Sequence, residues 1–121
     1  MIESIEFEHL ALSIKDLEKS VEFYHHILGF KLLDRPDFDF RGAWIDLHNG
    51  LQLHLIESDN AQVMSGSRLF HFAFKVADVN TIEKICKENQ IKYQPMKRRS
   101  DGVRQIFVED PDGWYVEFNS L

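Results

Sequence analysis

Three histidines and one glutamate occupy matching places in the two halves of this chain. His9 and His71 are 62 residues apart, and His54 and Glu117 are 63 residues apart. Imidazole nitrogens and carboxylate oxygens suit zinc, iron, nickel, cobalt and manganese, and three or four of them make a stable site. The four residues are therefore candidate ligands of one divalent metal. The alternative for any single strand histidine is a hydrogen-bonded core or surface position.

The segments around these residues repeat as well. Residues 9–17 match residues 71–79 at every apolar position, and residues 50–55 match residues 113–118 at nearly the same offset. Two copies are too few for a solenoid, so the sequence predicts two copies of one unit of about 60 residues.

The sequence of each copy predicts the same elements in the same order: one strand, one helix and then three further strands. The first copy has apolar spacing typical of a strand over 5–14, a helix over 17–28, and strands over 30–35, 42–47 and 51–57. The second copy predicts a strand over 69–76, a helix over 79–89, and strands over 91–95, 103–109 and 114–119. The order is βαβββ twice, in the α+β class. It gives a single domain over 1–121, with module 1 over 5–57, a connector over 58–68 and module 2 over 69–121.

The alternation of side chains along the strands places each of the four candidate ligands on the sheet face opposite the bulky apolar residues. Side chains of a strand alternate between the two faces of a sheet. In each copy the bulky residues of the first strand alternate with the histidine, so the helix is expected to cover the apolar face. His54 and Glu117 alternate in the same way with apolar residues of the last strands. Two twisted sheets related by a pseudo-twofold axis can bring such positions to one locus.

Composition excludes several classes of function. The formal charge is −6, so the chain lacks the basic surface that nucleic acid requires. No run approaches the roughly 18 apolar residues of a membrane span, and the N-terminus is acidic where a signal peptide is basic. Cys86 is the only cysteine, which excludes an internal disulfide and a thiolate zinc cluster, and it lies on the apolar stripe of its helix. These features predict a cytoplasmic protein.

Other residues have a structural and a functional interpretation. Phe38, Phe40 and Trp44 are expected in the core, with an apolar pocket lining as the alternative. Residues 97–99 are a basic run that is typical of solvated surface, or that binds a carboxylate of the substrate. The histidine pair 25–26 ends the first helix, where a cation complements the helix dipole.

Two longer motifs contain the candidate ligands. One runs from His9 to Phe30, with an aspartate seven residues after the histidine and Leu28-Gly29 at its end, and the other runs from Val108 to Glu117. Together they resemble the vicinal oxygen chelate superfamily. That group includes glyoxalase I, bleomycin-binding proteins, fosfomycin-resistance enzymes, extradiol dioxygenases and methylmalonyl-CoA epimerase. Residues 35–44 and 51–56 further resemble small glyoxalase-I-like proteins of plants and bacteria.

The resemblance implies a glyoxalase-like pair of half-barrels around a divalent metal, usually completed in a homodimer. Its four ligand positions fall on His9, His54, His71 and Glu117, with Glu117 and His54 as the candidate catalytic groups. Glyoxalase I typically has glutamate at position 54, so the resemblance is broken there. The trio His9, His71 and Glu117 matches the facial arrangement of iron dioxygenases and fosfomycin-modifying members.

The expected function is that of a metal-dependent lyase or isomerase, similar to lactoylglutathione lyase, acting on a small molecule with vicinal oxygens. A metal with open positions chelates two neighbouring oxygens, which permits isomerisation, epimerisation, epoxide opening or oxygen activation. Fosfomycin-modifying and dioxygenase chemistry therefore stay open as alternatives. So does a metal-free protein of the bleomycin-resistance type that binds a drug or metabolite.

Overall fold

The computed structural model describes residues 2–60 and 70–121. Contacts divide the chain into two compact units, Met1–Gln62 and Val63–Leu121. The described residues form one four-stranded mixed sheet in each unit, and each unit follows the order βαβββ. The predicted α+β class with two repeated modules is therefore confirmed. Most of the predicted connector, and residue 69 of the strand predicted after it, lie outside the described residues.

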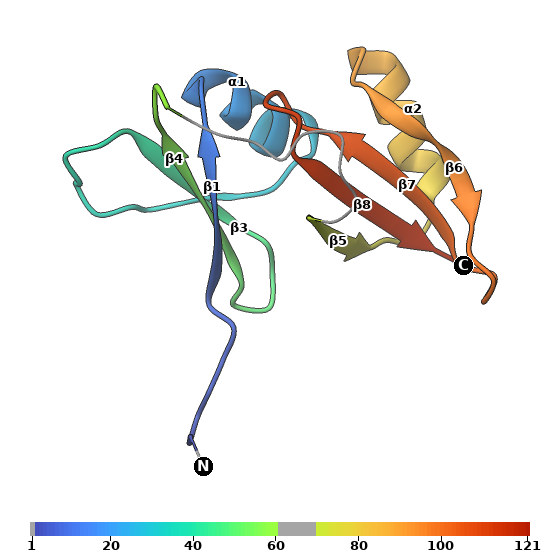
Figure 1. Ribbon diagram of the computed structural model, residues 1–121, viewed down its shortest axis with the longest axis horizontal. Helices are drawn as coiled ribbons and strands as arrows, with labels where there is room; N and C mark the ends of the chain where they lie inside the picture. The colour runs from blue at the N-terminus through green and yellow to red at the C-terminus, as the bar shows by residue number, and fades with distance from the viewer. Residues whose placement is uncertain (1, 61–69) are drawn as a thin grey trace. The chain divides into compact units, whose positions relative to one another are not determined.

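Unit 1 is built around a sheet in the order β1-β4-β3-β2 (Figure 1). Its elements are β1 (His9–Ile14), α1 (Leu17–Val21), the π-helix η1 (Glu22–Ile27), β2 (Leu32–Leu33), β3 (Gly42–Asp46) and β4 (Gln52–Glu57). β1 and β4 are parallel, whereas the β4–β3 and β3–β2 pairs are antiparallel. The apolar face of β1 and β4 supplies much of the core, through Leu12, Ile14, Leu53 and Leu55.

The helix of unit 1 differs from the prediction of one continuous α-helix over 17–28. Asp16 begins it by accepting a hydrogen bond from the Lys19 amide at 3.1 Å, as an N-cap does. After Val21 the turns widen into η1, and the Leu28 amide donates to the Phe23 carbonyl five residues earlier. The His25 ring bonds the carbonyl of Phe30, just beyond the end of the helix, at 2.7 Å.

Two strands of unit 1 are shorter than predicted. The strand expected over 5–14 begins only at His9, and Ile5 and Phe7 are more than 70% exposed. Figure 1 shows this N-terminal segment leaving the end of β1 without a neighbouring strand. The strand expected over 30–35 is reduced to Leu32–Leu33, the two residues that pair with β3. Apolar alternation therefore overestimated strand length where no partner strand exists to accept the hydrogen bonds.

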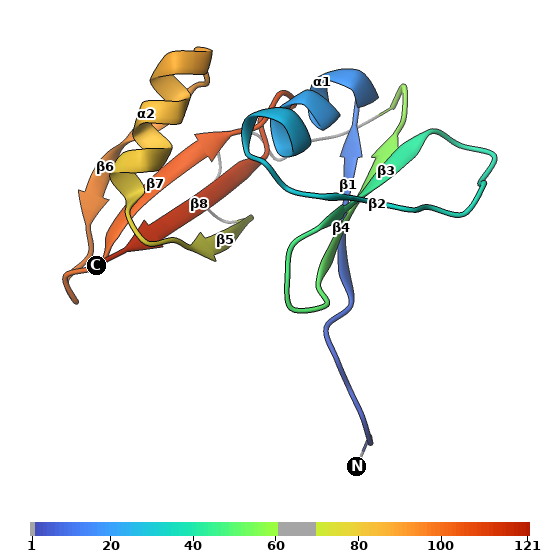
Figure 2. The same ribbon diagram turned by 180° about the vertical axis from the view of Figure 1, so that it is seen from behind.

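Unit 2 repeats the arrangement in the order β5-β8-β7-β6. Its elements are β5 (His71–Lys75), α2 (Val79–Asn89), β6 (Tyr93–Arg98), β7 (Arg104–Glu109) and β8 (Tyr115–Ser120). β5 and β8 are parallel, and α2 lies across one face of the sheet against β7 and β8 (Figure 2). Cys86 is fully buried in that layer, as predicted, and burial followed by the charge of Glu83 raises the pKa of its thiol to about 11.

β6 lies further along the chain than the strand predicted over 91–95. Its register against β7 shifts between Gln94 and Lys97, where the strand contains Pro95. Proline has no amide hydrogen for the ladder, so a bulge at this outer strand accommodates it. None of the helices within 2–60 and 70–121 has the length and apolar character required to cross a membrane.

Candidate metal centre

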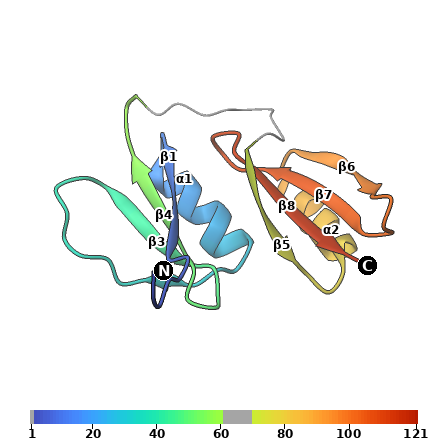
Figure 3. The same cartoon turned by 60° about the horizontal axis from the view of Figure 1, so that its bottom comes forward.

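The parallel pair β1–β4 brings His9 and His54 into contact in unit 1. Ala11 is the register partner of His54, and His9 lies two residues before Ala11 on the same face of β1. The rings of His9 and His54 stack with their centroids 4.0 Å apart and their planes 11° from parallel. Figure 3 shows β1 and β4 side by side, with α1 against one face of their sheet.

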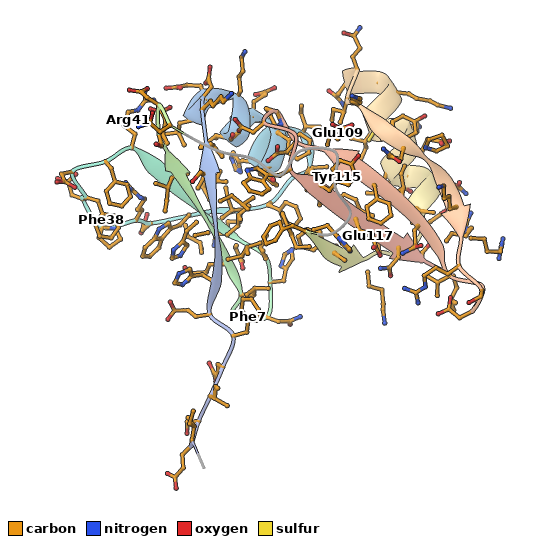
Figure 4. All side chains as sticks on the ribbon, in the orientation of Figure 1. Phe7, Phe38, Arg41, Glu109, Tyr115 and Glu117 are labelled. Carbon is orange, nitrogen blue, oxygen red and sulfur yellow. The ribbon has the colours of Figure 1, made fainter. Side chains whose placement is uncertain are left out.

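The equivalent pair β5–β8 brings His71 and Glu117 into contact in unit 2. Ala73 is the register partner of Glu117, so the small residue recurs at the matching position. His71 Nε2 lies 3.3 Å from Glu117 Oε1, and the Asn119 side-chain amide donates to Glu117 Oε2 at 2.7 Å. Glu117 is only 4% exposed; Figure 4 labels it on β8 together with Tyr115.

The two histidines of unit 1 use their ring nitrogens differently. His9 Nδ1 bonds the Glu8 carboxylate at 2.9 Å, so in the neutral ring Nε2 carries the lone pair. A carboxylate bonded to one ring nitrogen while a metal binds the other is the usual environment of a histidine ligand. His54 Nε2 instead bonds Gln52 Oε1 at 2.8 Å. The donor chemistry of His9 therefore fits a divalent metal.

Burial sets the charge of His54. Desolvation lowers the pKa of this half-buried imidazole below its ordinary value, and the neighbouring His9 lowers the pKa further. The neutral form of His54 therefore predominates at neutral pH. In this form one ring nitrogen keeps a lone pair that can accept a proton or bind a metal.

The four predicted ligands come together as two pairs, one in each unit. Within either unit, the described residues do not form a cluster of three or more His, Cys, Asp or Glu side chains suited to a metal. Neither pair alone supplies the three or four ligands of a stable metal site.

The prediction that Phe38 and Phe40 belong to the core is wrong. Each is 42% exposed, in the segment between β2 and β3; Figure 4 shows Phe38 out on this segment. The two rings stack on one another with centroids 5.1 Å apart, and the Arg35 guanidinium lies 4.9 Å from each ring centre. Local cation–π and stacking contacts thus replace core packing for these two residues.

Trp44 has a different environment from the one predicted. It is only partly buried, and its ring stacks on His54 with centroids 4.2 Å apart and planes 2° from parallel. Trp44 is the register partner of His54 on β3, so the contact follows from the strand pairing. It belongs to the immediate surroundings of a candidate ligand.

Sequence reasoning missed the polar residues that hold the candidate ligands. Gln52 and Asn119 lie two residues from His54 and Glu117 on the same strands, and each bonds the side chain of its neighbour. Because residues two apart in a strand share a face, this spacing was a usable signal. Glu8 precedes β1, so no parity argument would have found it.

The three residues of the basic run 97–99 do not share one role. Arg98 donates to the Gly102 carbonyl at 3.1 Å and Arg99 pairs with Asp101, so both hold the turn that follows β6. Lys97 is instead in register with Gln105 on β7, which is itself in register with Asn119 on β8. A cavity of about 360 Å³ lies at the end of this row, and its lining includes Lys75 and Asn119.

This chain is similar in sequence to a known protein superfamily. The model of the Glyoxalase/Bleomycin resistance protein/Dioxygenase superfamily matches residues 6–118. A lactoylglutathione lyase of Neisseria meningitidis is 33% identical over 121 residues, which cover 91% of this chain and 86% of that protein. Metallothiol transferase FosB of Lysinibacillus sphaericus is 30% identical over 119 residues, with 93% and 79% coverage. The chain belongs to this superfamily.

A solved structure agrees with the fold. The crystal structure of a glyoxalase family protein from Enterococcus faecalis matches with a TM-score of 0.80, covering 98% of this chain and 100% of that one at 24% identity. The resemblance inferred from the two sequence motifs is therefore confirmed at the level of family and fold.

Proposed function

We propose that this chain is a metal-dependent enzyme of the glyoxalase type, acting on a small molecule with two adjacent oxygens. The observation that carries the proposal is the pairing of donors at repeat-equivalent positions, His9 with His54 and His71 with Glu117. A divalent metal bound by these donors would polarise both substrate oxygens and stabilise negative charge that develops on them. Family membership supports the proposal.

Glu117 and His54 are the groups proposed to move the substrate proton. Asn119 donates to one carboxylate oxygen of Glu117, so the other oxygen is the one directed toward His71. The near-complete burial of Glu117 excludes water from its carboxylate, which favours proton exchange with a bound molecule. His54 adds a neutral imidazole beside His9.

A second candidate function is group transfer to a substrate of the fosfomycin kind. The trio His9, His71 and Glu117 supports it, because two imidazoles and one carboxylate leave coordination positions open. The FosB relative, at 30% identity, is consistent with this candidate.

Metal analysis of the protein purified without a histidine tag tests the metal site. We expect about one divalent metal per site in the natural protein, and loss of most of it in His71→Ala with the fold intact by circular dichroism. His26→Ala is the matched control, because His26 is an exposed histidine on η1 and should leave metal content unchanged. Full occupancy in His71→Ala would contradict the proposal, and a metal-free natural protein would favour the binding-module alternative.

We also propose that the protein forms a homodimer. A single pair of half-barrels is usually completed by twofold pairing in this family, and the exposed Ile5 and Phe7 supply apolar surface for a partner. Light scattering at micromolar concentration should give about twice 14.3 kDa. A monomer that still binds metal would show that one chain completes the site by itself.

A further inference from the structure

His54 lies between two parallel rings in unit 1. Trp44 covers one face of its imidazole at 4.2 Å and 2°, and His9 covers the other at 4.0 Å and 11°. The three rings come from β3, β4 and β1, three neighbouring strands of one sheet. Moving His54 out of this stack gives up two face-to-face contacts at once, so the stack fixes the plane of its ring.

The hydrogen bonds of the stack leave one imidazole suited to a metal. Gln52 Oε1 can only accept a proton, so His54 Nε2 is an N–H and is not available as a ligand atom. His9 is the reverse case, since its Nδ1 bonds Glu8 and its Nε2 keeps the lone pair. Gln52 and Glu8 thus select different nitrogens in the two rings.

Stacked imidazoles are poorly placed to share a metal. The lone pair of an imidazole nitrogen lies in the plane of the ring, and metals such as zinc bind about 2.0–2.1 Å from that nitrogen. The planes of His9 and His54 are nearly parallel and their centroids are 4.0 Å apart. The in-plane lone pairs of the two rings therefore lie in separate, nearly parallel planes, which does not suit two ligands of one metal.

We infer that Trp44 is a positioning residue that holds His54 off the metal, so that unit 1 contributes His9 alone as a ligand and keeps His54 as a free imidazole beside it. This inference rests on the proposed metal site and reduces its four candidate ligands to His9, His71 and Glu117. It gives His54 a role distinct from that of Glu117, which contacts the second histidine directly. The lone pair at His54 Nδ1 then remains for a proton of the substrate.

Cobalt(II) is the probe for the ligand set, because its visible absorption spectrum changes with the number and type of ligands. His54→Ala should leave the spectrum unchanged and the affinity within about threefold, whereas His9→Ala should weaken binding by at least about 100-fold. Trp44→Leu should alter the spectrum by releasing His54, and the double variant with His54→Ala should restore it. A changed spectrum in His54→Ala, or a loss of affinity equal to that of His9→Ala, would overturn the inference.

Nuclear magnetic resonance of the metal-free protein tests the stack independently of any metal. The ring protons of His54 should resonate upfield because the Trp44 ring shields them, and Trp44→Leu should move them downfield. Trp44→Phe, which retains a ring, should preserve part of the shift. Unshifted His54 resonances in the natural protein would overturn the inference. Failure to take up cobalt with the shielded resonances present would instead overturn the metal site, and the ligand assignment with it.

Discussion

The two units have the same backbone order and the same register around their candidate ligands, yet they present those ligands differently. In unit 1 the row across the sheet is Ala11, His54 and Trp44, and in unit 2 it is Ala73, Glu117 and Phe107. A small residue, a donor and an aromatic residue thus recur in the same order. The outcome is a stack of rings in unit 1 and a histidine–carboxylate contact in unit 2.

The identity of the middle residue accounts for this difference. An imidazole at position 54 can place its flat face on Trp44, whereas the carboxylate of Glu117 has no ring to stack and meets His71 and Asn119 instead. Phe107 meets the His71 ring in a T-shaped contact, with ring planes 81° apart, and does not stack as Trp44 does on His54. The residue type at this position therefore gives each unit its own arrangement of candidate ligands.

A change that makes unit 1 resemble unit 2 should have the largest effect on catalytic activity. His54→Glu replaces a stacked neutral ring with a carboxylate that can bind metal or accept a proton, the arrangement typical of glyoxalase I. We expect little isomerisation of a hemithioacetal by the natural protein, and a gain of about 10- to 100-fold in kcat/KM in His54→Glu, since a positioned base contributes about that much or more. Both proteins are assayed at equal metal loading.

His54→Gln is the matched control for that gain. Its amide is close to glutamate in size and shape but neither carries charge nor accepts a proton, so it should show no gain. Vigorous activity of the natural protein that His54→Glu abolishes would contradict the prediction. It would identify the stacked imidazole as the working group in this reaction.

The pairs themselves could be predicted from the sequence, but their contacts could not. The repeat and strand parity placed His9 with His54 and His71 with Glu117, because parity depends only on backbone geometry. Whether a side chain stacks or pairs depends on its rotamer and on neighbours from other strands, such as Trp44 on β3. Composition alone suggested core packing for Phe38 and Phe40, since it cannot distinguish an aromatic residue in a sheet from one in a loop.

The type of helix in unit 1 was another feature that the spacing of apolar residues could not predict. Tyr24 and Cys86 hold equivalent positions in the two copies, and both are fully buried. Tyr24 nevertheless lies in a π-helix and Cys86 in a regular α-helix. Apolar spacing over one or two turns is too coarse to separate these two hydrogen-bond patterns, so the sequence predicted a helix in unit 1 but not its type.

The turns that lead into β4 and β8 also differ between the two units, in a way that bears on stability. In unit 2 the Asp110 carboxylate is 4% exposed and accepts bonds from the amides of Asp112 and Trp114, both at 2.9 Å. In unit 1 the corresponding role falls to Asp46, a partly buried residue that accepts a solvent-exposed bond from the His48 amide at 2.8 Å. The same kind of turn is thus held by a buried carboxylate in one unit and by a partly buried carboxylate with an exposed bond in the other.

Asp110→Ala should therefore destabilise the protein more than Asp46→Ala. Removing the buried carboxylate takes away the acceptor of two amide bonds in unit 2, which costs about 1–3 kcal/mol, whereas water can replace the exposed bond in unit 1 for about 0.5 kcal/mol or less. Urea denaturation followed by tryptophan fluorescence measures both variants, with the midpoint compared at equal slope. Trp114 lies directly after the Asp110 turn, so fluorescence reports on the affected unit. Equal losses in the two variants would mean that Asp110, despite its burial, contributes no more to its turn than Asp46 does.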